Sequence, residues 1–247
     1  MDIAIKRQFL ERWETYFPGA ELPIVFSYSD EKLPSNTTSS EQGPHCIICD
    51  LASVREGMTR AFDASTINCG GARRYLGFET ELRPNFAHFL SCGIPGEMEG
   101  ERYKRSPELV ERYLESQPAF EAPGRTMVFK RWDDLDEKDA PDVVIFFAPA
   151  DVLSGLFTLA SFAEVDPQAV IAPFGSGCSS IVYHPYRELR SEHPRAVLGM
   201  FDVSARPCVP PDALSFAVPW PKFTDMVDQM EESFLITPSW HKVRSRL

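Results

Sequence analysis

Asp142-Val143-Val144-Ile145-Phe146-Phe147 is the stretch that decides the fold class. A short, continuous apolar run of this kind is typical of a strand that is buried on both faces. A strand is predicted before it, over 126–132, and a helix after it, over 152–162. We therefore expect a sheet whose two faces are covered by helices.

Predicted strands and helices continue outward from this run in both directions. Further strands are expected over 23–28, 59–62, 169–174, 195–203 and 214–218. Further helices are expected over 3–17, 46–58, 72–76, 106–115 and 222–234, and another begins at Cys178, whereas 33–44 is predicted to be a loop. The pattern predicts an α+β (mixed α/β) protein with a central mixed sheet, flanking helices and cysteine-bearing loops at helix starts.

Length and composition favour one domain over residues 1–247, with a weak subdivision point in the charged region 95–123. The chain carries 36 acidic and 25 basic residues, a net charge of −11, which argues against nucleic acid or an anionic membrane as the main partner. No apolar run approaches the roughly 20 residues of a spanning helix. The start of the chain is predicted to be a charged amphipathic helix and not a secretory signal, so we expect a cytoplasmic protein whose six cysteines are reduced thiols.

Four of these cysteines occupy positions that suit chemistry. Cys46 and Cys49 form a Cys-x-x-Cys pair, Cys69 precedes two glycines, and Cys178 ends the sequence Gly-Ser-Gly-Cys. Each lies at or near a predicted helix start, where exposed N–H groups favour thiolate over thiol. Thiolates bind metals and iron–sulfur clusters, and they also serve as nucleophiles. Simple packing of buried cysteines is the alternative for all four, and it is the reading that we prefer for Cys92 and Cys208.

Neighbouring residues supply candidate binding groups. Gly70 and Gly71 let the backbone approach a bulky ligand closely. Gly177 belongs to the loop Gly175-Ser176-Gly177, which is flexible, rich in hydrogen-bond donors and placed after a predicted buried strand, where ligands gather in sheet proteins. Arg73, with Arg74 beside it, is placed to stabilise a thiolate, an anionic cluster or a substrate carboxylate.

Other polar residues are weaker candidates. His45 adjoins Cys46, and His184 follows Cys178 in the same predicted helix, where it is the best candidate for a Cys–His pair. Asp202 and Arg206 flank the end of a predicted strand, where a structural ion pair is the simpler expectation.

Several segments occur together in a fixed order: Cys69-Gly70-Gly71 with Tyr75-Leu76-Gly77, Pro141-Asp142-Val143-Val144, Leu153-Ser154-Gly155-Leu156, Gly175-Ser176-Gly177-Cys178, Ala196-Val197-Leu198-Gly199 with Asp202 and Arg206-Pro207, and Glu232-Ser233-Phe234 with Trp240. Over roughly residues 20 to 246, the chain resembles the uncharacterised prokaryotic family catalogued as domain of unknown function 169. The resemblance implies a soluble cytoplasmic protein and brings no established reaction or substrate. It also implies that the recurrent cysteines of the family correspond to Cys69, Cys178 and one of Cys46 and Cys49.

Three functions remain open from the sequence. The first is an iron–sulfur protein, in which Cys46, Cys49, Cys69 and Cys178, or three of them, hold a 4Fe–4S cluster that serves a small-molecule ligand or a redox partner. The second is a metal-free thiol enzyme that uses Cys178 or Cys69 as nucleophile. The third is a non-catalytic module that binds a small anion through the glycine loops, Arg73 and Arg74.

Overall fold

The computed structural model describes residues 1–31 and 46–247. The loop predicted over 33–44 and the candidate His45 lie outside the described residues.

A seven-stranded sheet forms the centre of the molecule, in the order β2-β3-β1-β4-β7-β6-β5. Neighbouring strands are antiparallel except for β5 and β6, which are parallel. The strands are β1 (Ile24–Ser29), β2 (Arg60–Phe62), β3 (Thr126–Arg131), β4 (Val143–Ala148), β5 (Val170–Ile171), β6 (Ala196–Gly199) and β7 (Leu214–Pro219).

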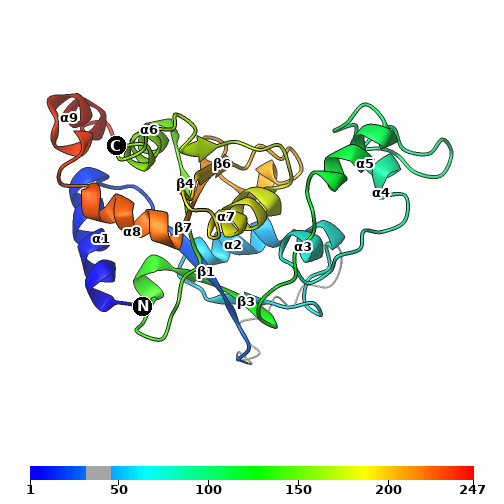
Figure 1. The fold of residues 1–247 in the computed structure, drawn as a ribbon, viewed down its shortest axis with the longest axis horizontal. Helices are drawn as coiled ribbons and strands as arrows, with labels where there is room; N and C mark the ends of the chain where they lie inside the picture. The colour runs from blue at the N-terminus through cyan, green and yellow to red at the C-terminus, as the bar shows by residue number, and fades with distance from the viewer. Residues whose placement is uncertain (32–45) are drawn as a thin grey trace.

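Helices cover the two faces of this sheet, and each face has its own apolar core (Figure 1). The cysteine-bearing face carries α2 (Ile47–Arg55), α3 (Gly70–Tyr75), the π-helical turn η3 (Ser179–Tyr183) and α7 (His184–Glu188). The opposite face carries α1 (Ile3–Tyr16), α6 (Ala150–Ala160), α8 (Trp220–Gln229) and α9 (Pro238–Arg244). Short 3-10 turns are η2 (Trp132–Asp134), η4 (Arg206–Cys208) and η5 (Phe234–Ile236).

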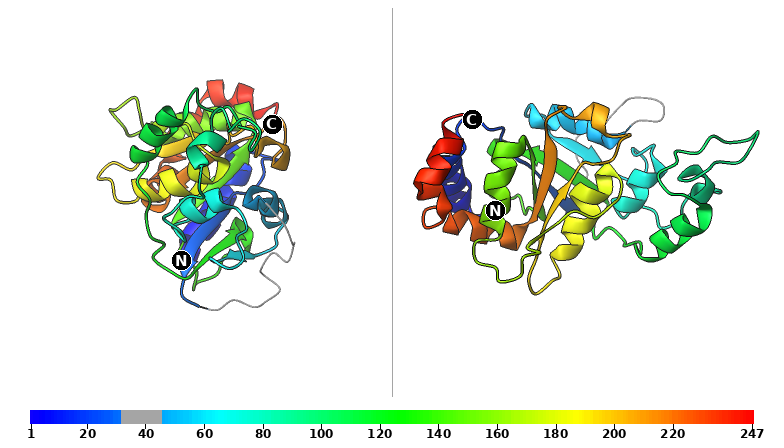
Figure 2. Two further views of the ribbon diagram at one scale, coloured as in Figure 1. Left: turned by 90° about the vertical axis from the view of Figure 1, so that its right-hand side faces the viewer. Right: turned by 90° about the horizontal axis from the view of Figure 1, so that it is seen from above.

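One segment stands apart from these layers. Helices α4 (Phe86–Phe89) and α5 (Pro107–Glu115) project from the sheet beyond α3, as Figures 1 and 2 show. This projecting segment includes the charged region in which the sequence indicated a weak subdivision.

β4 is the strand on which both cores are built. All six of its residues are buried. Val143, Ile145 and Phe147 belong to the cysteine-side core, while Val144, Phe146 and Ala148 belong to the opposite core. Side chains alternate between the faces of a strand, so one apolar run contributes to two cores. Each full burial of such a large apolar side chain stabilises the fold by about 1.5–3 kcal/mol.

The α+β class and its mixed sheet are confirmed, and most predicted elements form close to the expected residues. β5 spans only Val170–Ile171, although a strand was predicted over 169–174. The run ends there because Pro173 has no amide hydrogen for a ladder and Gly175 begins the turn toward Cys178. Helices α4 and α9 were not predicted, since both are too short to show a clear apolar period.

Gly155 on α6 tests how closely the core opposite the cysteines is packed. A Cβ at this position would lie 2.5 Å from the Trp240 ring and 2.7 Å from the Phe17 ring. Gly155→Ala should therefore lower the free energy of unfolding by about 1–3 kcal/mol through overpacking, despite the better helix propensity of alanine. Chemical denaturation measures the change.

The exposed Ser154, one residue earlier on α6, provides the control. Ser154→Ala should change the unfolding free energy by no more than about 0.5 kcal/mol. Equal stability of the two variants would contradict the packing described here.

Candidate functional site

Five of the six cysteines belong to segments that pack on one side of the sheet. Cys46 caps the N-terminus of α2, Cys69 caps α3, and Cys178 comes directly before η3. α3 packs against η3, and α2 packs against η4, which ends at Cys208. Cys46, Cys69 and Cys178 are free thiols, while Cys49 of α2 is bonded to Cys208. The sixth cysteine, Cys92, is exposed and lies in the projecting segment.

The pairing of Cys49 corrects two expectations. We expected all six cysteines to be reduced, and Cys208 to be a packing residue, but these two form a disulfide across 159 residues of sequence. Cys49 is therefore not a free thiolate in this structure. Of the four proposed ligands, Cys46, Cys69 and Cys178 keep free sulfurs.

Asp202 anchors the turn that carries Cys178. Its Oδ2 accepts a hydrogen bond from the Gly177 backbone N–H at 2.9 Å. Its Oδ1 accepts from both the backbone N–H and the hydroxyl of Ser204, at 3.0 and 2.8 Å. One carboxylate thus connects the Cys178 turn to the chain segment that leads to Cys208. The ion pair that we expected between Asp202 and Arg206 is replaced by these bonds.

Gly177 lies where the Cys178 turn, the segment that leads to Cys208 and α2 meet. A Cβ there would lie 3.1 Å from the Ala205 Cβ, 3.2 Å from the Ile48 Cγ1 and 3.2 Å from the Met200 Sδ. The sequence predicted that Gly177 belongs to a ligand-binding loop, and in the folded chain the atoms nearest to it belong to the protein itself. Gly177 therefore brings Cys178 against the helix that Cys46 caps.

Burial and neighbouring thiols raise the pKa of two of the three free cysteines on this face, Cys46 and Cys178. Burial raises the pKa of Cys46, and the nearby Cys69 and Asp202 raise it further, against the opposing effect of backbone N–H groups of Ile48 and Cys49. Burial raises the pKa of Cys178 well above its usual value, and Cys46, Cys69 and Asp202 add to the shift. The helix starts were expected to lower these pKa values. Desolvation outweighs them, because Cys178 lies within the apolar core and the half-buried Cys46 packs against it.

The two arginines beside Cys69 bind protein groups. Arg73 Nε donates to the Ile67 carbonyl at 2.6 Å, and its Nη1 lies 3.8 Å from the Glu79 carboxylate. Arg74 is buried and donates to the carbonyls of Thr80 and Gln117. Arg73 thus positions the segment that leads into Cys69.

The glycines after Cys69 are less constrained than Gly177. Gly70 has open space where a Cβ would lie. At Gly71 a Cβ would contact the Cys69 sulfur at 3.8 Å, which is an ordinary contact distance.

His184 has surroundings that keep it neutral. Its ring contacts the Tyr183 ring, and Nε2 is buried without a hydrogen-bond partner among the described residues. Burial, with Arg187 nearby, lowers the pKa of His184 to about 4. The chain between Cys178 and His184 winds as a π-helical turn, so the α-helical alignment expected for a Cys–His pair does not form.

Sequence reasoning missed the importance of Asp142, the acidic residue that starts the decisive apolar run. Its Oδ2 accepts the Tyr28 backbone N–H at 3.1 Å. Burial raises the pKa of Asp142 to about 6. The signal available in the sequence was a carboxylate directly beside a strand buried on both faces.

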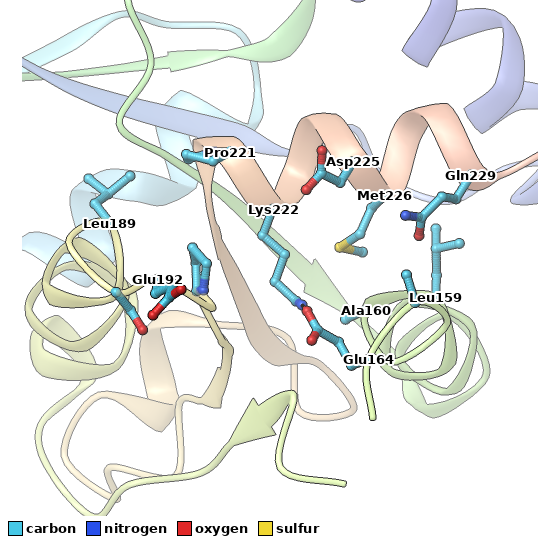
Figure 3. A pocket seen from close by; sticks show the side chains of 13 residues that line it. Leu159, Ala160, Glu164, Leu189, Glu192, Pro221, Lys222, Asp225, Met226 and Gln229 are labelled. Carbon is cyan, nitrogen blue, oxygen red and sulfur yellow. Dashed lines mark hydrogen bonds and ion pairs between the residues drawn. The ribbon is translucent and has the colours of Figure 1, made fainter. Parts of the chain in front are cut away.

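A separate pocket of about 260 Å³ lies on the opposite side of the sheet, between the end of α6, α8 and the segment after α7 (Figure 3). Lys222 reaches across it to Glu164, with Nζ 2.8 Å from Oε1. Lys222 is only 6% exposed, whereas Glu164 is 27% exposed. Glu192 and Asp225 also line the pocket.

Neither a metal-holding group nor a membrane-spanning helix is found among the described residues. No group of three or more His, Cys, Asp or Glu side chains in the described chain is arranged to hold a metal ion. Within the same residues, no helix combines the length and apolar character needed to cross a membrane.

The fold and site define an α+β sheet protein with three free cysteines and a disulfide on one face of its sheet. A family model described as DUF169, Uncharacterised ArCR, matches residues 22–229. The chain belongs to this family, which confirms the resemblance found in the sequence. Comparisons with curated proteins and with solved structures found no match.

Asp142 should make stability depend on pH. Its folded-state pKa of about 6 exceeds the ordinary 3.8, so the native protein binds this proton more tightly than the unfolded chain does. Its contribution is fully present below about pH 4 and is lost as pH rises to about 6. Asp142→Asn should therefore be more stable than the native chain by about 1–2 kcal/mol at pH 7, after allowance for partial solvent screening, and the gain should vanish near pH 4.

Urea unfolding at several pH values measures this difference. The exposed Asp212, changed to Asn, removes the same charge from the surface and is the matched control. A gain for Asp142→Asn that is constant with pH would contradict the predicted titration.

Removing Glu164 and removing Lys222 from the ion pair in the pocket should lower the stability of the fold by different amounts. Glu164→Gln leaves the buried Lys222 ammonium without its counter-charge and should destabilise the fold by about 1–3 kcal/mol. Lys222→Met removes the buried charge and leaves a carboxylate that water can reach, so it should cost less. Thermal and urea unfolding of both variants will test this order, and the reverse order would refute it.

Proposed function

We propose that this protein binds an iron–sulfur cluster through Cys46, Cys69 and Cys178, leaving one iron without a cysteine ligand. The observation that carries the proposal is that three free thiols from separate segments of the chain pack at the same apolar core. They lie close enough for Cys69 to raise the pKa of both Cys46 and Cys178. Such a set requires three independent stretches to fold together, and a cluster is a group that uses several thiolates at once.

The chemistry of the donors favours a soft metal. The three candidate ligands are all sulfurs, and thiolate sulfur selects Zn, Cu(I) and iron–sulfur clusters over hard cations. Burial holds Cys46 and Cys178 in the neutral thiol form when no cation is present. A bound metal centre would offset the cost of ionising them in an apolar core.

The number of donors favours a cluster over a structural zinc ion. Cys49 is bonded to Cys208, so three cysteines remain as donors on this face of the sheet. A structural zinc site is closed by four protein ligands, and this set has three. The N–H groups of Ile48 and Cys49, which interact with the Cys46 sulfur, are of the kind that tunes cluster potentials.

Two further features suit such a site. The π-helical turn that follows Cys178 is a form found frequently at functional sites. Asp202 and Gly177 hold this turn against α2, so the ligands would be positioned before any metal arrives.

The two alternative functions gain less from the structure. A cysteine nucleophile needs a lowered pKa, and burial raises that of Cys178. An anion-binding module needs free donors, but Arg73 and Arg74 already donate to backbone carbonyls.

Anaerobic reconstitution with iron and sulfide tests the proposal. Native protein should bind both and develop visible absorbance. Cys46→Ser, Cys69→Ser and Cys178→Ser should each lose most of the iron, because an alkoxide is a far weaker ligand than a thiolate. Iron, acid-labile sulfide and absorbance per protein are the measurements.

The other three cysteines supply the controls. Cys92→Ser, in the projecting segment, should retain the cluster. Cys49→Ser and Cys208→Ser should retain it too, provided that the protein is reduced before reconstitution so that Cys46 stays a free thiol. A colourless native protein would refute the function, while iron loss in Cys92→Ser equal to that at the three ligands would refute the assignment.

A further inference from the structure

We propose that Cys49 is a redox-active cysteine that alternates between Cys208 and Cys46 as its disulfide partner, and that it exchanges electrons with external dithiols and their disulfides. The proposal goes beyond cluster binding and concerns the protein whether or not metal is present. Cys46 is the residue that the two chemistries share.

The pattern of cysteine pairing suits disulfide exchange. Four cysteines in the described residues are free, and one pair is bonded. A disulfide framework that stabilises an exported domain pairs most of its cysteines. A single bonded pair beside three free thiols is instead the arrangement in which exchange can occur, because attack by a thiolate is how disulfides rearrange.

The pair is also accessible. Cys49 and Cys208 are both half-buried, at the margin of the apolar core and not within it. A small dithiol can therefore approach the bond from solvent, whereas Cys178 is only 6% exposed.

Both sulfurs are held in place independently of the bond. Cys49 lies on α2 between the buried Ile48 and Leu51. Cys208 ends η4, where Arg206 donates to the carbonyls of Ala213, Pro210 and Pro211. Reduction would leave the two thiols adjacent, so the bond can form again without refolding.

Cys46 is the thiol best placed to compete for Cys49. It caps α2, and the Cys49 N–H donates to its carbonyl at 2.9 Å. Residues three apart at the start of a helix lie on the same side, so the two sulfurs share one surface of α2. Cys46 is also half-buried, so the exchange takes place where solvent can deliver a proton.

The exchange balances without another reagent. The Cys46 thiol loses its proton to water, its thiolate attacks the Cys49 sulfur, and the Cys49–Cys208 bond breaks as the Cys46–Cys49 bond forms. Cys208 leaves as a thiolate that takes up a proton from water. Net reduction needs an external dithiol. Its first thiolate opens the protein disulfide and its second closes on the first, so two electrons pass to the protein, the dithiol becomes a cyclic disulfide, and two protein thiols result.

Peptide mass after trypsin digestion distinguishes the two bonds. Peptide 33–55 contains both Cys46 and Cys49, and peptide 196–222 contains Cys208, because trypsin does not cleave between Arg206 and Pro207. Metal-free, full-length protein would be incubated with dithiothreitol and its oxidised form at several ratios without denaturant, alkylated and digested. The Cys49–Cys208 bond joins the two peptides, whereas the Cys46–Cys49 bond leaves peptide 33–55 alone, two hydrogens lighter.

In native protein, the joined peptides should disappear and return reversibly as the ratio changes. Cys208→Ser should shift oxidised protein to the Cys46–Cys49 form. In the double variant Cys46→Ser with Cys208→Ser, peptide 33–55 should be alkylated at Cys49, whereas Cys92→Ser should behave as native.

Three results would overturn the proposal. One is a joined peptide that dithiothreitol reduces only after denaturation, which would mark a structural bond. The second is native protein that never yields the joined peptide under oxidising ratios. The third is Cys208→Ser protein that leaves Cys46 and Cys49 unpaired on oxidation. Since no iron is used, these results are distinct from failure of the cluster.

Discussion

Burial of β4 on both of its faces is the constraint on which the rest of the structure depends. An antiparallel sheet can leave one face in water, but this strand alternates large apolar side chains on both sides. Helices must therefore cover both faces. On one side α1, α6 and α8 pack as long amphipathic helices, and on the other the covering consists of short pieces, namely α2, α3, η3 and α7. Short elements have many ends, and the cysteines lie at those ends.

The site follows from that difference between the two faces. A helix end exposes N–H groups that favour an anion, while the core beneath it disfavours any charge. At Cys46 and Cys178 the second effect is larger, as the raised pKa values of both thiols indicate. Each of these sulfurs is therefore mostly a neutral thiol, and a bound cation would stabilise its thiolate. We propose a metal centre for this reason, and the accessible pair, Cys49 and Cys208, carries the thiol exchange.

The sequence predicted the helices, strands and turns that local patterns determine. The apolar run at Asp142–Phe147, the amphipathic helices at both ends and the glycine turn at Cys178 could each be recognised within about ten residues, which is the range over which period and turn chemistry act. Cysteines at several helix starts also predicted one site for Cys46, Cys49, Cys69 and Cys178. The structure places all four in segments on one side of the sheet, with Cys49 bonded to Cys208.

The contacts that could not be predicted are those between distant segments. Cys49 meets Cys208 only because β4, β7 and β6 place the segment after β6 beside α2. Asp202 binds the Gly177 N–H for the same reason. Arg74 was expected to stabilise a ligand, but it donates to the carbonyl of Gln117, which is 43 residues away in the sequence. No local pattern distinguishes these partners from others of the same type.

The short edge strands of the sheet limit how it can pair with another chain. Its outermost strands are β2, with three residues, and β5, with two. An edge strand offers unpaired N–H and C=O groups to any other extended chain, and a long, flat edge invites association between copies. These two edges provide too few consecutive groups for a stable ladder. The described part of the sheet thus offers little template for pairing with another chain, although its central strand β4 is apolar and buried along its whole length.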